Sequence, residues 1–120
     1  MYLDEVRDFA LAIDREVEEC FPFGPETFVY KTSGKVFLLM SFDELHLRLN
    51  VKCDPDLAEE LREMHSSIIP GFHMNKKHWN TLILDGSLPG KLIKDSIQGS
   101  YKLVAKKPKI VKRIKKDKTN

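Results

Sequence analysis

The segment HMNKKHW gathers most of the side chains in this chain whose chemistry suits a ligand. It contains two histidines, an asparagine, two lysines and the only tryptophan: His73, Asn75, Lys76, Lys77, His78 and Trp79. Lysines bind phosphates, asparagine and histidine form hydrogen bonds, and an indole can stack on an unpaired base. A solvated hairpin connection with a tryptophan packed on the sheet has the same composition. A polyanion site is therefore one of two interpretations of this segment.

A second basic surface is predicted from LHLRLNVK, residues 45–52. Its leucines and valine alternate strictly with polar residues, which is typical of a strand with one buried face. The polar positions are His46, Arg48, Asn50 and Lys52. Arg48 and Lys52 are candidate phosphate contacts if this strand lies beside the HMNKKHW segment, although solubility alone also explains a polar face.

The spacing of the remaining reactive residues does not favour a metal centre or an active site. His73 and His78 are five residues apart, unlike zinc ligands. The sequence has no nucleophile elbow, phosphate-binding glycine loop or dinucleotide fingerprint. We expect no catalytic residue and no cofactor. The acidic N-terminal segment invites comparison with carboxylate sites for hard cations such as iron, but acidic helix faces are usually just solvated.

The length and the charge distribution of the chain indicate how many domains it forms and where the domain ends. With 120 residues and 42% hydrophobic residues, the chain is long enough for one globular domain. The net charge of +2 hides an asymmetry, because residues 1–19 carry seven acids and two arginines, whereas residues 106–118 carry eight Lys/Arg and one Asp. We expect one domain over residues 1–105 and a flexible basic tail over 106–120, which either favours polyanions or is simply solvated.

The cellular setting follows from what the sequence does not contain. Cys20 and Cys53 are the only cysteines and have no CxxC spacing, so we expect reduced thiols. The start MYLDEVRDF does not resemble a secretory signal, and no apolar run approaches the ~20 residues that span a bilayer. We expect a cytoplasmic monomer that does not enter membranes.

Hydrophobic periodicity predicts the elements that must position these residues. A stripe from Leu3 to Val17 indicates a helix over 2–19, and FPFGPE breaks it. Strands follow at 27–31, 35–41 and 45–52, the first two joined by a turn in which Gly34 takes positive φ. The inward residues of the third strand are expected to be Leu45, Leu47, Leu49 and Val51.

The second half predicts a helix over 53–65, two strands within 67–85 and a helix from Pro89 to near Lys106. Asp54 suits the N-cap of the middle helix, and Leu57, Ala58, Leu61 and Met64 are expected to face the core. The element order is α-β-β-β-α-β-β-α. We therefore predict a two-layer α+β sandwich whose antiparallel sheet has one face covered by helices and one face open.

Four of these segments together resemble the MmcQ/YjbR family of small bacterial proteins. They are FPFGPETFVYKTSGKVF, CDPDLAEELRE, PGFHMNKKHWNTLILDG and SYKLV, and they cover most of residues 19–105. The resemblance implies a fold similar to bacterial frataxin (CyaY-like). It also implies a DNA-binding role through a double-wing module. A non-catalytic module that binds a protein or a small ligand is the alternative, and a frataxin-like metal binder is a third.

Overall fold

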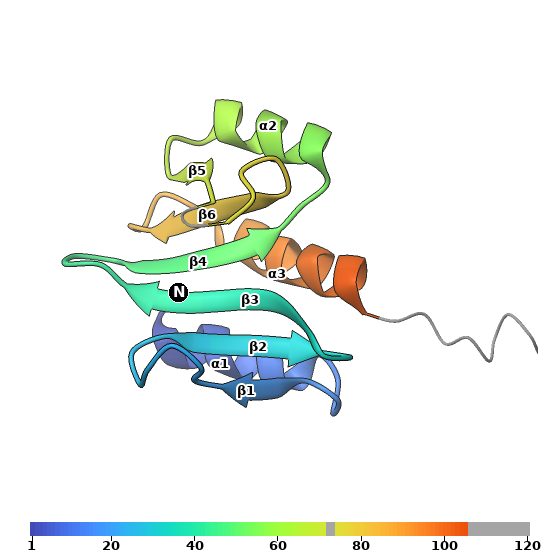
Figure 1. The fold of residues 1–120 in the computed structure, drawn as a ribbon. Helices are drawn as coiled ribbons and strands as arrows, with labels where there is room; N and C mark the ends of the chain where they lie inside the picture. The colour runs from blue at the N-terminus through green and yellow to red at the C-terminus, as the bar shows by residue number, and fades with distance from the viewer. Residues whose placement is uncertain (72–73, 106–120) are drawn as a thin grey trace, which may run out of the picture.

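The protein folds into two layers, a six-stranded antiparallel sheet and three helices (Figure 1). The computed structural model describes residues 1–71 and 74–105, so His73 and the basic tail lie outside the described residues. The elements are α1 (Leu3–Ala12), β1 (Glu18–Cys20), β2 (Phe28–Thr32), β3 (Lys35–Phe42), β4 (Leu47–Lys52), α2 (Pro55–Met64), β5 (Ile68–Pro70), β6 (Trp79–Leu84) and α3 (Gly90–Val104). The predicted α+β sandwich is confirmed.

The strand order is β1-β2-β3-β4-β6-β5, with every neighbouring pair antiparallel. The β2–β3 turn is closed by Ser33 and Gly34, whose φ angles are 54° and 77°. Positive φ at both central residues gives the turn a twist that matches the flanking strands. The predicted hairpin and its glycine are therefore confirmed.

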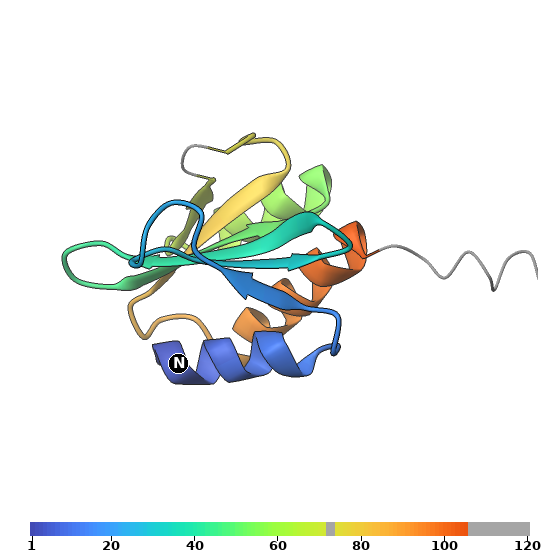
Figure 2. The same cartoon turned by 60° about the horizontal axis from the view of Figure 1, so that its bottom comes forward.

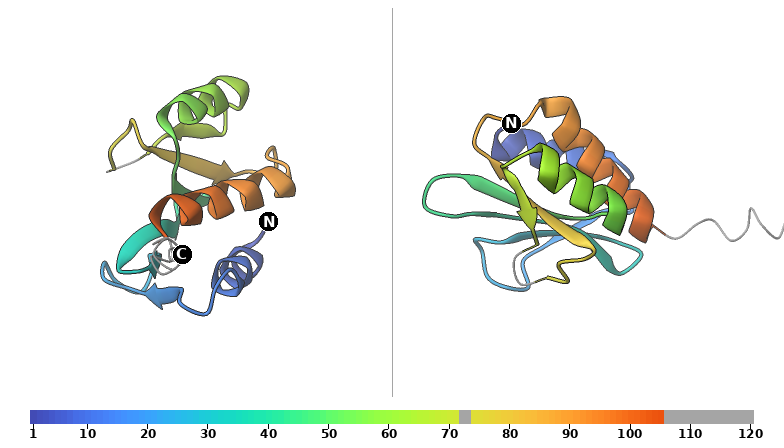
Figure 3. Two further views of the ribbon diagram at one scale, coloured as in Figure 1. Left: turned by 90° about the vertical axis from the view of Figure 1, so that its right-hand side faces the viewer. Right: turned by 90° about the horizontal axis from the view of Figure 1, so that it is seen from above.

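The helices α1 and α3 cover one face of the sheet, and α2 lies beside α3 near the β5 edge (Figures 1 and 3). The core between the layers is made of buried aliphatic and aromatic side chains, among them Val6, Tyr30, Leu38, Leu49, Leu82 and Ile97. The other face of the sheet has no helix over it among the described residues. It is called the open face below.

A β-bulge ties α3 to the centre of the sheet. Tyr30 pairs with Leu38 while Lys31 pairs with Val36, so Phe37 is an extra residue in β3. The bulge turns Phe37 toward the helices, where its ring packs edge-on against Tyr101 at 5.5 Å between centroids. The buried Ser100 hydroxyl donates to the Phe37 carbonyl and accepts from the Lys52 N–H.

The first helix is shorter than predicted, and β1 was missed. α1 ends at Ala12, and a turn follows in which the Val17 N–H donates to the Asp14 carbonyl. Val17 is buried although it lies beyond the end of the helix. Its position continues the helical spacing of the apolar residues, and for this reason the predicted helix was too long. The Glu19 carboxylate in β1 accepts from Arg7 and from the Tyr30 hydroxyl, and the Arg7 hydrogen bond lowers the pKa of Glu19.

Two further expectations about apolar residues were wrong. Leu45 is 81% exposed, because β4 begins only at Leu47 and the preceding turn is held by the Asp43 carboxylate, which accepts from the Leu45 and His46 N–H groups. On α2, Leu57 and Met64 are exposed at 47% and 65%. This helix packs near the sheet edge and buries only the narrow stripe at Ala58, with Leu61 partly covered. The N-cap was correct, since Asp54 accepts from the Leu57 N–H.

Candidate nucleic-acid interface on the open face

The open face receives every second residue of β4 and β6. Residues 47–52 alternate between buried and partly exposed, as predicted, so Arg48, Asn50 and Lys52 point away from the helices. The register pairs Lys52 with Trp79 and Arg48 with Ile83. The fold therefore brings the tryptophan of HMNKKHW next to one of the two candidate cations of the neighbouring strand.

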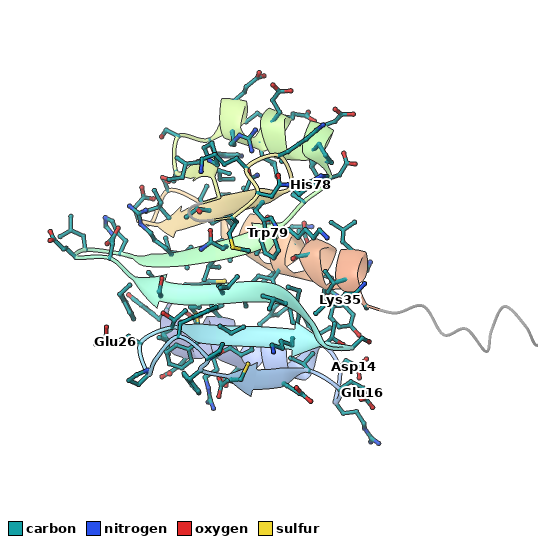
Figure 4. The ribbon with its side chains drawn as sticks, in the orientation of Figure 1. Asp14, Glu16, Glu26, Lys35, His78 and Trp79 are labelled. Carbon is teal, nitrogen blue, oxygen red and sulfur yellow. The ribbon has the colours of Figure 1, made fainter. Side chains whose placement is uncertain are left out.

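The turn before Trp79 presents two lysines to solvent. Lys76 and Lys77 are both exposed, and His78 and Trp79 are partly buried where β6 begins (Figure 4). The Asn75 side chain accepts from the Lys77 N–H, and the Asn75 carbonyl accepts from the N–H groups of His78 and Trp79. Asn75 therefore shapes the turn that holds the lysines.

Trp79 is fixed by a close approach of two backbones. The Gly71 N–H donates to the Trp79 carbonyl at 2.8 Å. A Cβ at position 71 would lie 2.7 Å from the Trp79 Cβ, a separation that real side chains do not show. On the other side, the His78 carbonyl accepts from the Cys53 N–H. Only glycine at position 71 allows the indole to sit where it does.

Arg48 is engaged elsewhere. Its guanidinium donates to the Asp43 carboxylate at 2.6 Å, in the turn at the far end of β4. Two backbone N–H groups and this arginine hold the pKa of Asp43 at about 2, so the pair is formed at neutral pH. Arg48 and Lys52 are four positions apart on β4, which corresponds to ~13 Å along a strand. The two predicted cations therefore do not converge on one point.

Two loops flank the open face. The segment between β1 and β2 and residues 74–78 before β6 both lie on the side of the sheet away from α1 and α3 (Figures 2 and 3). The first loop carries Phe21 and Phe23, exposed at 43% and 72%, and Phe21 packs edge-on against Phe28. Sequence reasoning missed these aromatic residues, although the prolines and glycine of FPFGP indicated a loop in which side chains have little to pack against.

The charges on the strands of the open face are mostly positive. Strand pairing places Lys31, Arg48 and Lys52 on this face against one carboxylate, Glu18. Lys76 and Lys77 add two exposed cations in the turn before β6, where the Lys76 carbonyl accepts from the Arg62 guanidinium of α2. Glu26 lies in the first loop (Figure 4). The helices carry more acids than bases, because α2 alone has four carboxylates and one arginine.

The described residues offer no obvious reactive centre. Outside residues 72–73 and 106–120, no three His, Cys, Asp or Glu side chains are grouped so that they could hold a metal ion. Burial raises the pKa of the Cys53 thiol, which makes it a poor nucleophile. Ser67 and Ser87 donate to Asp85 and lower its pKa, and this cluster closes the turn after β6. In the same part of the chain, none of the helices has the length and apolar character to cross a bilayer.

The fold and the open face define a class of small α+β sandwich proteins, and comparisons place the chain within it. The YjbR family model matches residues 15–103, so the chain belongs to the YjbR family. It is 41% identical to Escherichia coli O157:H7 YbdF over 88 residues, which cover 73% of this chain and 72% of that protein. It is 39% identical to Escherichia coli K12 YjbR over 71 residues, which cover 59% and 60%.

Solved structures agree with the fold. The crystal structure of Deinococcus radiodurans protein DR2400 superimposes with a TM-score of 0.81 at 41% identity, covering 88% of this chain and 79% of that one. A crystal structure of a Pseudomonas syringae protein gives a TM-score of 0.75 at 27% identity, covering 86% and 98%.

Proposed function

We propose that the protein is a non-catalytic, DNA-associated accessory protein that binds polyanions through the open face, largely by backbone electrostatics. The observation that carries the proposal is the pairing of Lys52 with Trp79 directly beside the exposed Lys76 and Lys77. Ammonium groups next to an indole suit phosphates and the face of a base. The two flanking loops are compatible with the double-wing arrangement that the family resemblance implies.

The absence of a helix across the open face shapes the expected mode of binding. No described helix is placed to enter a major groove from this side, so direct reading of base edges is not expected. Contacts to phosphates carry no sequence information, and their strength falls steeply with salt. We propose that this takes place in the cytoplasm, where the free thiols of Cys20 and Cys53 stay reduced.

The test is a titration of duplex and single-stranded DNA at about 50 and about 200 mM salt. Lys76→Ala/Lys77→Ala should weaken binding of all sequences and reduce the salt slope by about one unit per lost phosphate contact. The matched control is Lys91→Ala/Lys102→Ala, which removes the same charge from α3 on the opposite side. The control variant should retain more binding than the open-face variant.

Three outcomes contradict the proposal. One is no binding of either DNA at low salt, and another is equal loss in the two lysine variants. The third is loss only when Lys112, Arg113, Lys115 and Lys116 are replaced by glutamine, because that result would assign binding to the tail.

A non-catalytic protein-binding module is the second candidate, favoured by an apolar patch at one end of the sheet. Tyr2, Phe42 and Leu45 are exposed at 82%, 61% and 81%, and they line a common hollow beside His46. Exposed apolar groups that cluster are typical of interaction surfaces. If DNA does not bind, a defined partner whose binding is lost in Leu45→Ser but retained in Lys76→Ala/Lys77→Ala would support this candidate.

A further inference from the structure

A largely apolar groove lies between α2 and α3, and of the candidate residues of the open face only Lys52 borders it. It has a volume of about 320 Å³. Its floor is formed by β4 and β6 through Val51 and Leu82, and its walls by Leu57 and Leu61 of α2 and by Leu92 and Leu103 of α3. Leu57 and Leu103 are about half exposed. An apolar groove of this size needs an occupant to shield it from water.

A glycine deepens the groove. Gly99 lies in the interior of α3 and lines the groove, and a Cβ at this position would meet nothing within 4 Å. The residue has no positive φ that would require glycine. Glycine disfavours a helix interior relative to alanine, so this position keeps the groove open at the expense of helix stability.

The rim of the groove is acidic. Asp54 and Asp95 line it, and the adjoining α2 carries Asp56, Glu59, Glu60 and Glu63 against Arg62. The Arg62 guanidinium is occupied by the Asn80 side chain. The only ion pair of the rim in the described chain joins Lys91 to Asp95, and both side chains are largely exposed, so it can exchange partners easily. The chemistry of the groove therefore fits a segment with branched apolar side chains among cations.

The chain itself supplies such a segment directly after the groove. Leu103 lines the groove, and the described chain ends two residues later at Ala105. The sequence that follows holds Ile110, Val111 and Ile114 among eight lysines and arginines. Residues 106–114 can reach ~30 Å when extended, whereas the fifteen residues of α3 are ~22 Å long. These three apolar residues can therefore reach any point along the groove.

We propose that the groove between α2 and α3 is the docking site of this chain's own basic C-terminal segment, residues 106–120. Ile110, Val111 and Ile114 cover the apolar floor, and the cations around them lie against the carboxylates of the rim. Because the segment is tethered next to the groove, its effective concentration is in the millimolar range, so even weak intrinsic affinity gives a populated docked state. Docking removes these cations from any polyanion, so the groove and the polyanion compete for the tail.

The test measures how fast trypsin cleaves after the tail lysines and arginines in the full chain, followed by mass spectrometry. Docking should slow cleavage about tenfold, the value for an intrinsic dissociation constant ten times below the effective concentration. Gly99→Phe fills the groove and should remove the protection, whereas Gly99→Ala adds one methyl group and should retain it. Ile110→Ser/Val111→Ser/Ile114→Ser keeps the charge of the tail, and trypsin should cleave this variant as fast as it cleaves Gly99→Phe.

A chain that combines Gly99→Phe with the three serine substitutions separates docking in the groove from other effects on cleavage. The combined chain should be cleaved no faster than either parent, because both changes break the same contact. Equal cleavage rates in the natural chain, Gly99→Phe, the triple serine variant and the combined variant would overturn the proposal. Protection that survives Gly99→Phe would overturn it as well. Protection that rises with protein concentration would instead assign the groove to the tail of a second copy. Neither result bears on the lysines of the open face, so the two proposals fail independently.

Discussion

The two sides of β4 and β6 carry opposite chemistry within one pair of strands. On the open face, Lys52 and Trp79 lie side by side in a surface with more cations than acids. On the helix side, Val51 and Leu82 form the floor of an apolar groove with an acidic rim. The difference follows from the two-residue period of a strand, which sends neighbours such as Val51 and Lys52 to opposite faces. Two neighbouring strands can therefore carry a cationic surface and an apolar groove back to back.

The largest effect is expected at Ser100, which connects the two sides. Its buried hydroxyl accepts from the Lys52 N–H and donates to the Phe37 carbonyl. Ser100→Ala leaves both backbone groups without this hydrogen-bond partner. Each buried polar group without a partner lowers the free energy of unfolding by about 1–3 kcal/mol. We expect a loss of about 3 kcal/mol in the free energy of unfolding, measured in urea. Ser96→Ala, one turn earlier on the groove side, is the control and should lose less than about 1 kcal/mol.

Gly71→Ala should damage the open face while leaving the groove intact. The new methyl group would meet the Trp79 Cβ at 2.7 Å, so the backbone around the indole must shift. Overpacking of this kind costs about 1–3 kcal/mol. The chain has a single tryptophan, so the emission maximum reports its surroundings directly. Unchanged emission together with unchanged stability would show that the approach of the two backbones does not fix the indole.

Gly99→Ala should raise the free energy of unfolding, in contrast to Gly71→Ala, which should lower it. The methyl group enters open space in the interior of α3, where alanine is favoured over glycine by about 1 kcal/mol. We expect the midpoint of urea unfolding to rise with no change in tryptophan emission. A fall in stability would mean that the groove wall cannot accept even one methyl group, which would contradict the open space described for it.

The fold was largely predictable because β4 alternates cleanly between buried and partly exposed residues and the turns use residues with clear backbone preferences. The β2–β3 hairpin follows from Gly34, and the face of Lys52 follows from the pattern of residues 47–52. The errors arose where an apolar residue packs outside the helix, or away from the core face, that its spacing had indicated. Val17 is buried beyond the end of α1, so the predicted helix ran on into β1, and Leu57 faces the groove instead of the core.

The candidate site was less predictable, because it depends on pairings between distant segments. Sequence patterns identified Lys52 and Trp79 but could not show that they are register partners. Nor could they show that Arg48 is bound to Asp43, since that contact depends on a turn closed by a carboxylate. The groove could not be predicted from the sequence, because it forms only where the distant segments α2 and α3 pack side by side.

The smallest effect is expected at this Asp43–Arg48 pair, where Asp43→Asn would release the arginine to the open face. The folded pKa of Asp43 is about 2, below the ordinary value of 3.8, so its contribution to stability is present above that ordinary value and is lost as the pH falls toward about 2. The stability difference between the natural chain and Asp43→Asn should therefore shrink over that window. At neutral pH the variant should bind DNA more tightly and with a salt slope steeper by about one unit, because one more cation is available. An unchanged slope would mean that Arg48 lies too far from Lys52 to share a polyanion, and the interface would be confined to the β6 turn.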